Sequence, residues 1–394
     1  MIPLVYVAGQ VFTQEKLRFP MGIVALLIWM LFIFAFIPNT SFVLRSVGYG
    51  VWLFLDILTV LVAVQIFNNL ERVRVLLRWY LAAFLIVSIV GLGQLVLGVS
   101  HLPAPFVQQW FIKGAWPRLN GFSYEPSYFA TYLVMGWVLS AYLLEKRSTL
   151  LPRHLVQATF GTSTLALILA TSRLGWATMI VWGAGYAFRN IRHISLPKFS
   201  LAGWLLAFNV VALGVGAASA LAVYESKSIF ESVAGGTGLF GTPAHSVNDR
   251  ESSMQDTLGL VYKSPFLGYS LGGIAPAIGE ENWEDIKTQE GAKKREGMSV
   301  FVEVLAASGV IGFIPFTIYI LTIFLKPTML ARKCRGEYGT VLFGLVWALG
   351  IELLILQFNQ NILRPYLWFH IAVLSATYAA VNADTVKRKS NARA

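Results

Sequence analysis

Several arginines and one glutamate lie at the edges of long apolar segments. A charged side chain in or near a bilayer is costly, so it usually has a functional or pairing role. Arg118 and Glu125 lie within RLNGFSYEP, directly before an apolar run, and Arg173 separates two apolar runs in ATSRLG. Arg250 lies in a long polar segment, and Arg364 directly precedes another apolar run. A guanidinium group binds phosphate through two parallel hydrogen bonds. Arginines gathered at one membrane face would therefore suit an anionic headgroup, above all a diphosphate.

Two of these residues also have a simpler interpretation. Pro126 suits the first turn of a helix, and Glu125 before it would complement the positive end of the helix dipole. Arg173 would then be an arginine whose stem lies in the bilayer and whose charged head reaches the interface. The sequence leaves both alternatives open beside a role in binding substrate.

Other side chains are candidates for the same site. Glu303 stands five residues into an apolar run, near the leaflet in which the arginines are expected, so it could act as a base or orient an acceptor. We expect the deeper carboxylates Asp56 and Glu352 to bond neighbouring helices instead. The residues expected to bind substrate are Arg118, Tyr128, His245, Lys263, Glu303 and Arg364.

The composition assigns these residues to a membrane protein. The 394 residues are 56% hydrophobic and 13% charged, with a mean hydropathy of +0.63, whereas soluble domains carry roughly 25% charged residues. The single cysteine, Cys334, excludes an intramolecular disulfide and a CxxC site, and the five histidines show no metal-ligand spacing. We expect neither a metal nor a cofactor.

Apolar runs that cross a bilayer as helices need about 20 residues. Ten such runs predict an all-α fold, a polytopic bundle of about ten transmembrane helices that forms a single membrane domain over residues 1–394. The predicted spans are 20–38, 48–67, 77–99, 126–144, 155–171, 174–188, 200–223, 298–325, 338–358 and 365–381.

The basic residues predict how this bundle is oriented. The net charge is +11, and most Lys and Arg lie in one set of alternating connections. Because Lys and Arg accumulate on the cytoplasmic side, we expect that set and both termini in the cytoplasm, and we interpret the basic runs as anchors, not as a nucleic-acid surface. The long connection between spans 7 and 8, residues 224–297, is then periplasmic. The opposite short connections hold only Arg45, Lys113, Arg118, Arg173 and Arg364.

Four stretches, in this order, resemble the O-antigen ligase and O-antigen polymerase family of bacterial envelope glycosyltransferases. RLNGFSYEPSYFATYL is similar to the family's Arg-x-x-Gly and Glu-Pro-Asn/Ser at a helix start, and LALILATSRLGWATMIVWG to its Ser-Arg boundary between spans. DRESSMQDTLGLVYKSPFLGYSLGG is similar to its outer-loop Arg, a helix and Pro-x-x-Gly-x-Gly. SVFVEVLAASGVIGFIPF is similar to its helix after the long loop, with Gly-x-x-Gly. The resemblance covers about residues 118–325.

This resemblance implies an all-helical bundle of the bacterial inner membrane with a periplasmic catalytic loop. It implies a donor glycan on undecaprenyl diphosphate and a reaction that needs neither a metal nor a nucleotide sugar. Arg173 and Arg250 match the family's phosphate-binding positions, and with Glu125 they are the expected catalytic residues; Glu303 and His245 are the other candidate bases. The expected partners are a polyprenyl-diphosphate-linked oligosaccharide, the lipid bilayer and other polysaccharide assembly proteins.

One departure from the family bears on the reaction. Ligases carry a His-Asn pair at the start of the helix after the long loop, where this chain has Met298 and Ser299. The missing histidine favours a polymerase of surface polysaccharide or exopolysaccharide over a ligase that transfers glycan to a lipid core, which stays the alternative. The alternative of another class is a transporter or flippase of lipid-linked glycans, which would show broken helices at midmembrane and two pseudo-symmetric halves.

Overall fold

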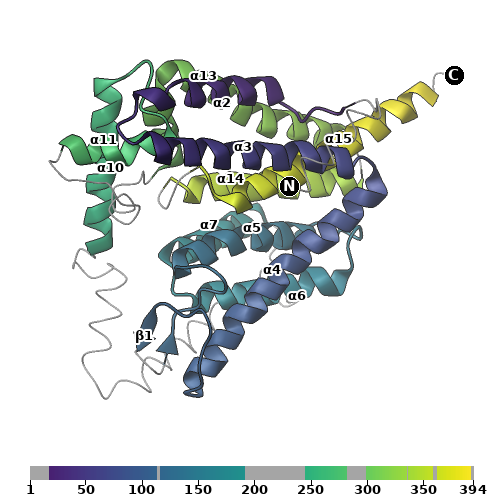
Figure 1. Ribbon diagram of the computed structural model, residues 1–394. Helices are drawn as coiled ribbons and strands as arrows, with labels where there is room; N and C mark the ends of the chain where they lie inside the picture. Colours follow the sequence, from purple (N-terminus) through teal and green to yellow (C-terminus); the bar gives the residue numbers. More distant parts are fainter. Residues whose placement is uncertain are drawn as a thin grey trace. The chain divides into compact units, whose positions relative to one another are not determined.

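The protein is nearly all helical (Figure 1). A computed structural model gives the structure of residues 17–112, 116–190, 245–281, 299–334, 336–357 and 362–391. Within these residues the strands β1 (Trp110–Ile112) and β2 (Trp116–Pro117) pair antiparallel, and all other regular elements are helices. The prediction of an all-α fold is confirmed.

Nine of the ten predicted spans coincide with a helix, and the remaining one, 200–223, lies outside the described residues. These helices are α2 (Ile23–Ala35), α3 (Val43–Ile66), α4 (Leu70–Val99), α5 (Pro126–Glu145), α6 (Arg153–Leu169), α7 (Arg173–Asn190), α13 (Val300–Lys333), α14 (Glu337–Ile355) and α15 (Pro365–Asn391).

Five of the described helices are long and apolar enough to cross a membrane, namely α3, α4, α5, α13 and α14. A shorter apolar helix, Ile23–Asn39, combines α2 with the 3-10 turn η1 (Ile37–Asn39). The chain is therefore a multi-pass membrane protein, while the number of ten spans stays a prediction. That the whole chain forms a single membrane domain also stays a prediction.

The described part of the long predicted periplasmic connection consists of two helices joined by glycine-rich turns. Helix α10 (His245–Lys263) is followed by the 3-10 turn η3 (Leu271–Gly273) and by α11 (Ile274–Glu281). Between α10 and η3, the backbone of Gly268 has a positive φ of 74°. The rest of the connection lies outside the described residues.

The chain divides into two compact units. Unit 1 comprises Met1–Tyr80, Ser148–Pro152 and Arg250–Ala394, and unit 2 comprises Leu81–Arg147 and Arg153–Asp249. Helix α4 therefore contributes its first turns to unit 1 and the rest to unit 2. We describe each unit separately.

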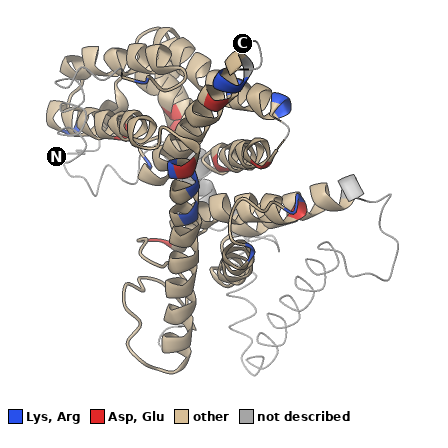
Figure 2. Ribbon diagram, turned by 90° about the vertical axis from the view of Figure 1, so that its right-hand side faces the viewer, with Lys and Arg blue, Asp and Glu red and all other residues tan. Residues whose placement is uncertain are grey.

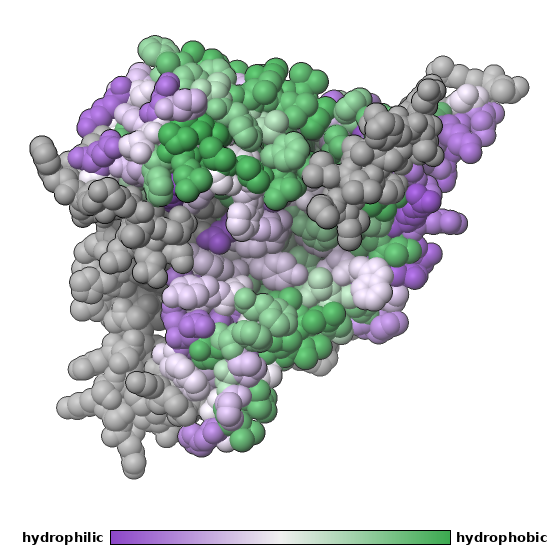
Figure 3. Space-filling model, viewed as in Figure 1, coloured by the Kyte–Doolittle hydropathy of each residue, from purple (hydrophilic) through white to green (hydrophobic). Residues whose placement is uncertain are grey.

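Aromatic side chains fill the core of unit 1. Trp29 of α2 is fully buried against Phe316 of α13, with ring centroids 4.9 Å apart. Tyr319, one turn further along α13, stacks on Trp368 of α15 at 6.4 Å. These two pairs fasten α2 and α15 to α13, and the exposed apolar side chains of α2 and α13 form the hydrophobic surface seen in Figure 3.

A buried histidine joins three helices of unit 1. His370 of α15 is fully buried, its Nε2 lies 2.8 Å from the Leu345 carbonyl oxygen of α14, and its Nδ1 lies 2.5 Å from the Tyr80 hydroxyl of α4. Because a carbonyl oxygen only accepts, Nε2 donates, and the hydroxyl donates to Nδ1. The imidazole is therefore a neutral structural bridge, which removes it from the candidate bases.

The connections that the charge pattern predicts as cytoplasmic are hydrogen-bonded to one another in unit 1. Lys and Arg gather over the start of α4 and the C-terminal end of α15 (Figure 2). The bonds that join the connections run from Arg18 to the Asn68 carbonyl (2.8 Å), from Arg74 to the Leu150 carbonyl (2.9 Å), from the Tyr338 hydroxyl to the Leu70 carbonyl (2.9 Å) and from the Thr149 hydroxyl to Glu337 (3.1 Å).

Helix α13 is broken at Gly309, whose φ of 57° and ψ of −177° are not helical. A break leaves N–H and C=O groups without helical partners, which costs several kcal/mol per group in hydrocarbon. Residues 265–270, which follow α10, supply the missing partners. The bonds run from Tyr269 N to Ala306 O (3.0 Å), from Ser270 N to Ala307 O (2.7 Å), from Val310 N to Pro265 O (2.8 Å) and from Ile311 N to Phe266 O (3.4 Å).

Two glycines allow the two backbones to approach this closely. A Cβ on Gly268 would lie 2.5 Å from the Ala307 carbonyl carbon, and a Cβ on Gly309 would overlap the Phe266 carbonyl. Both glycines also have φ in the left-handed region, which other residues avoid. The Pro-x-x-Gly and Gly-x-x-Gly motifs of the sequence are therefore two sides of one backbone contact, which we call the glycine clamp.

Unit 2 packs its helices through small residues. The Phe84 ring of α4 fills the space that a Cβ on Gly136 of α5 would take, and the Ser88 and Ser163 hydroxyls of α4 and α6 lie 3.0 Å apart. Small side chains let transmembrane helices approach closely and hydrogen-bond across the interface. α4, α5 and α6 therefore form a tight frame for the loops at their ends.

Alanine substitutions test the glycine clamp. We expect Gly268→Ala and Gly309→Ala each to lower the thermal unfolding temperature of the purified protein, because each adds about 1–3 kcal/mol of backbone strain and forces a Cβ into the facing backbone. Gly259→Ala is the matched control, since Gly259 of α10 has nothing within 4 Å of its Cβ position. Equal unfolding temperatures for all three variants would contradict the clamp.

Candidate functional site

Arg118 is held at the turn between α6 and α7 in unit 2. Its Nε donates to the Thr171 hydroxyl at 3.1 Å, and Nη2 lies 3.5 Å from the Thr171 carbonyl oxygen. Nη1 donates to the Gln109 side chain at 2.9 Å. Since Thr171 directly precedes Ser172 and Arg173, the structure brings Arg118 to the turn that begins α7. Two arginines of the predicted outer face therefore belong to one local arrangement.

The loop that carries Arg118 is shaped by one buried glutamine. The Gln94 amide group of α4 donates to the carbonyls of Pro105 and Gly121 at 2.9 and 2.8 Å, and its oxygen accepts from the Gly121 N–H at 2.9 Å. Gly121 has φ of 55°, and the Phe129 ring lies 2.8 Å from its Cβ position. Asn120 adds bonds from its amide group to the Phe106 and Ser123 carbonyls. The Arg-x-x-Gly motif therefore forms a rigid turn, with Arg118 held at one end and Gly121 at the other.

The starts of α5 and α7 come together in unit 2. A Cβ on Gly175, in the first turn of α7, would lie 3.5 Å from the Cβ of Ala130 in α5. Thr171 takes a positive φ of 52° and ends α6, and the Trp176 indole N–H donates back to the Ile168 carbonyl at 3.0 Å. N–H groups at the start of a helix carry partial positive charge. Two helix starts beside Arg118 therefore form an electropositive region.

Arg173 is the first residue of α7. The described part of the structure gives its backbone, and its side chain lies outside the described residues. Its assignment as a phosphate-binding residue stays a prediction. What the structure adds is the fixed position of the helix start from which this side chain projects.

Glu125 occupies the N-cap position of α5, and its carbonyl oxygen accepts the N–H groups of Tyr128 and Phe129 at 3.1 and 3.2 Å. Its side chain makes no capping hydrogen bond; the carboxylate instead accepts from the Ser127 hydroxyl at 3.1 Å. The half-buried Glu125 and Tyr128 share this helix start. The bonds described for Arg118 and Glu125 therefore include different partners, Thr171 and Ser127, and the role of Glu125 as a base stays a prediction.

In unit 1 the structure brings two other predicted residues to one polar cluster. Glu303 is buried in the first turn of α13 and accepts the Ile362 N–H at 3.1 Å. Arg364 caps α15 through its carbonyl oxygen, which accepts the Leu367 N–H at 3.0 Å. Glu352 of α14, expected to bond helices, is fully buried, and neither of its carboxylate oxygens has a hydrogen-bond partner among the described residues. Glu303 therefore bonds the first turn of α13 to the segment that leads into α15.

The remaining predicted residues lie on α10. His245 is the first residue of this helix, Arg250 follows within it, and Lys263 ends it with an exposed side chain. The side chains of His245 and Arg250 lie outside the described residues, as does Met298. By sequence position His245 belongs to unit 2, whereas Arg250, Lys263, Glu303 and Arg364 belong to unit 1. Among the described residues, no three His, Cys, Asp or Glu side chains gather as a metal site.

Arg45 is a residue that the sequence analysis did not select. It is buried at the start of α3, donates to the Tyr49 hydroxyl at 2.8 Å and lies 4.9 Å from the Tyr49 ring centroid. It also lies 3.5 Å from the Gly272 carbonyl, and a Cβ on Gly272 would be 2.5 Å from Ser46 Cα. The signal in the sequence was an arginine on the disfavoured side, one helical turn before a tyrosine. Arg45 holds the glycine-rich turn at Gly272 against α3.

Three comparisons with known proteins bear on this arrangement. A protein-family model described as O-antigen ligase matches residues 158–317, which include most of α6, all of α7 and α10, and the glycine clamp. No curated protein and no solved structure matches the chain. The match supports the resemblance that the ordered motifs indicated: residues 158–317 are similar to the O-antigen ligase family.

Proposed function

We propose that this protein is a metal-independent glycosyltransferase of the bacterial inner membrane. It extends or transfers a glycan carried on undecaprenyl diphosphate at the periplasmic face. The observation that carries the proposal is the anchoring of Arg118 at the turn before Arg173, beside the starts of α5 and α7. Cations and helix starts at one outer edge suit a diphosphate leaving group.

The reaction is a displacement at the anomeric carbon of the donor glycan. The acceptor hydroxyl oxygen forms a bond to that carbon, the bond from the carbon to the diphosphate oxygen breaks, and the lipid diphosphate leaves with the electron pair. Arg173 and Arg250 neutralise the charge that develops on the leaving diphosphate. The hydroxyl proton goes to a base, for which Glu125, Glu303 and His245 are the candidates.

Polymerisation is favoured over ligation to a lipid core. The ligase histidine is replaced by Met298 in this sequence, and the acceptor is then a second lipid-linked glycan. Tyr128, Lys263 and Arg364 are proposed to bind substrate, and other polysaccharide assembly proteins are proposed as partners.

A transporter of lipid-linked glycans is less well supported. A broken helix would fit such a protein if the break lined a path for substrate. In α13 the groups freed at Gly309 are instead bonded by residues 265–270. The backbone groups at the break therefore bind residues 265–270 and do not line a path for substrate.

Cysteine labelling tests which side of the membrane α10 and the C-terminal end of α13 face. In a Cys334→Ser background, we expect a membrane-impermeant maleimide to label Tyr262→Cys in cells with an intact inner membrane, since Tyr262 is 83% exposed on α10. Lys333→Cys, at the end of α13, should be labelled only after that membrane is opened. The reverse pattern, or equal labelling, would show that the orientation is wrong.

Arginine substitutions test the leaving-group site. We expect Arg173→Ala and Arg250→Ala each to reduce glycan assembly by roughly thirty- to several-thousand-fold, because removing one partner of a buried charged hydrogen bond costs about 2–5 kcal/mol. Arg→Lys should restore little, since the bidentate geometry is lost.

Polymer length on gels measures this effect, with protein abundance in membranes as the check on insertion. Arg153→Ala is the matched control, because Arg153 is exposed at the opposite end of α6 from the turn that precedes Arg173. Normal polymer from both Arg173→Ala and Arg250→Ala would show that neither arginine binds the leaving group. Each would then only place its charged head at the membrane interface.

Substitutions at Glu125 separate a charge role from a capping role. Glutamine keeps an oxygen that can accept from Ser127 but has no charge, so we expect Glu125→Gln to lower glycan assembly by about a hundredfold, the scale of general base catalysis. A cap or dipole role is worth only roughly 0.3–2 kcal/mol of stability. Ser127→Ala, which removes the hydrogen bond and keeps the carboxylate, should retain activity. Normal polymer from Glu125→Gln would exclude Glu125 as the base.

A further inference from the structure

A cavity opens at the end of unit 1 that carries the predicted cytoplasmic connections. Its volume is about 360 Å³, and it lies between the turn before α2, the Lys326 region of α13 and the C-terminal half of α15. Its polar lining comes from Arg18, Lys326, Tyr378 and Asn382, and its apolar lining includes Phe19. The walls thus combine charge with hydrophobic surface.

Among the described residues, the lining holds two cations and no carboxylate. The Arg18 guanidinium donates one hydrogen bond, from Nη1 to the Asn68 carbonyl at 2.8 Å, which fixes its position and leaves its other N–H donors for a further acceptor. Lys326 is exposed on α13, and none of the described carboxylates pairs with it. Because the described part of the wall holds no counter-charge to Arg18 and Lys326, an anion is the complementary ligand.

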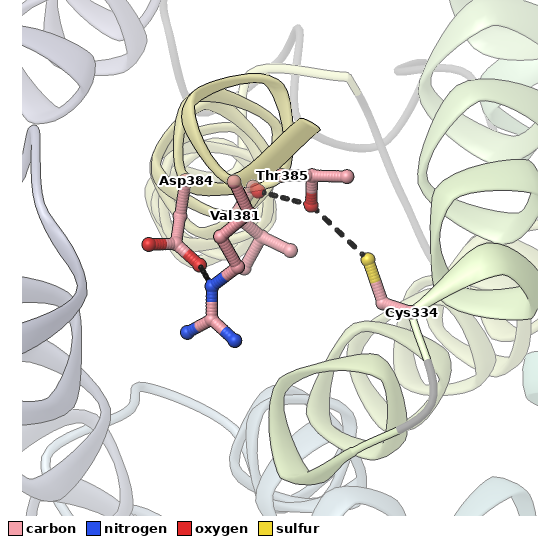
Figure 4. A network of polar contacts seen from close by, with 5 residues as sticks. Cys334, Val381, Asp384 and Thr385 are labelled. Atoms are coloured by element: carbon pink, nitrogen blue, oxygen red, sulfur yellow. Dashed lines mark hydrogen bonds and ion pairs between the residues drawn. The ribbon is translucent and has the colours of Figure 1, made fainter. Parts of the chain in front are cut away.

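A second cavity at the same end of unit 1 differs in this respect. It measures about 490 Å³ and is lined by Lys333 and Arg388 together with Glu337 and Asp384. Arg388 pairs with Asp384 at 2.7 Å (Figure 4). Its charges are therefore balanced within the protein, which singles out the first cavity.

The surface beside the first cavity is apolar. Phe19, which lines the cavity, is 65% exposed, and Leu325, the neighbour of Lys326 on α13, is 55% exposed. Exposed apolar side chains of this kind face the hydrocarbon of the bilayer. A ligand with a phosphate group and acyl chains fits such a site better than a free anion does.

We propose that this cavity binds the headgroup of an anionic phospholipid from the cytoplasmic leaflet. Arg18 and Lys326 contact the phosphate, Asn382 and the Tyr378 hydroxyl bond the rest of the headgroup, and the acyl chains lie along Phe19 and Leu325. Basic pockets between transmembrane helices on the cytoplasmic side suit anionic headgroups. The site is separate from the proposed reaction, which takes place at the opposite face.

Thermal unfolding of the full-length protein in detergent tests the site. The probes are phosphatidylglycerol, phosphatidylcholine and inorganic phosphate, each titrated to saturation. We expect phosphatidylglycerol to raise the unfolding temperature of the wild type more than the other two. Lys326→Gln should weaken its apparent affinity roughly five-fold, and Arg18→Gln with Lys326→Gln roughly thirty-fold.

Lys333→Gln is the matched control, since it removes a cation from the second cavity, and it should bind phosphatidylglycerol as the wild type does. Lys326→Gln keeps the test valid if the double variant fails to fold, because Lys326 makes no hydrogen bond or ion pair among the described residues. Equal effects of the two lipids, or unchanged affinity in Lys326→Gln, would overturn the proposal. An equal effect of inorganic phosphate would show an anion site that does not select a lipid.

Discussion

The structure depends on a constraint of the bilayer, which offers no water to bond a free N–H or C=O group. A helix can break in hydrocarbon only where another part of the protein takes over its backbone bonds. At Gly309 that part is residues 265–270, which bond both sides of the break with distances between 2.7 and 3.4 Å. Residues 265–270 of the long connection are therefore part of the helical bundle of unit 1.

The glycine clamp also fixes the residues of the long connection that follow it. After the glycine clamp, the Ser270 hydroxyl donates to the Ile33 carbonyl at 3.2 Å, and Gly272 lies against Ser46 and Arg45. Residues 268–273 are thus fixed to α13, α2 and α3 in turn. A predicted substrate loop that is rigid at these residues can hold Lys263, ten residues before Gly273, at a constant place in unit 1.

The sequence predicted the helices and missed the contacts between their ends. Apolar run length reveals a helix because each residue adds 1.5 Å to a span of fixed thickness, and α3, α4, α5, α13 and α14 coincide with predicted spans. The bond from Arg118 to Thr171 joins residues 53 positions apart, and no local pattern encodes such a distance. Arg45 and Gln94 were missed for the same reason. The glycine motifs were noticed, but their pairing at Gly268 and Gly309 required coordinates.

The arginines of the predicted outer face differ in what their guanidinium N–H groups bind. Arg45 uses its guanidinium on Tyr49 and Gly272, and Arg118 uses its own on Gln109 and Thr171. Guanidinium N–H groups that donate to oxygens of the protein fix the position of nearby helix starts. Fewer of these N–H groups then remain for a ligand. The cations proposed to meet a diphosphate are other residues, namely Arg173 at the start of α7 and Arg250 on α10. Both lie within residues 158–317, which are similar to the O-antigen ligase family. The arginines whose donors hold the fold and those proposed to bind substrate are therefore different residues.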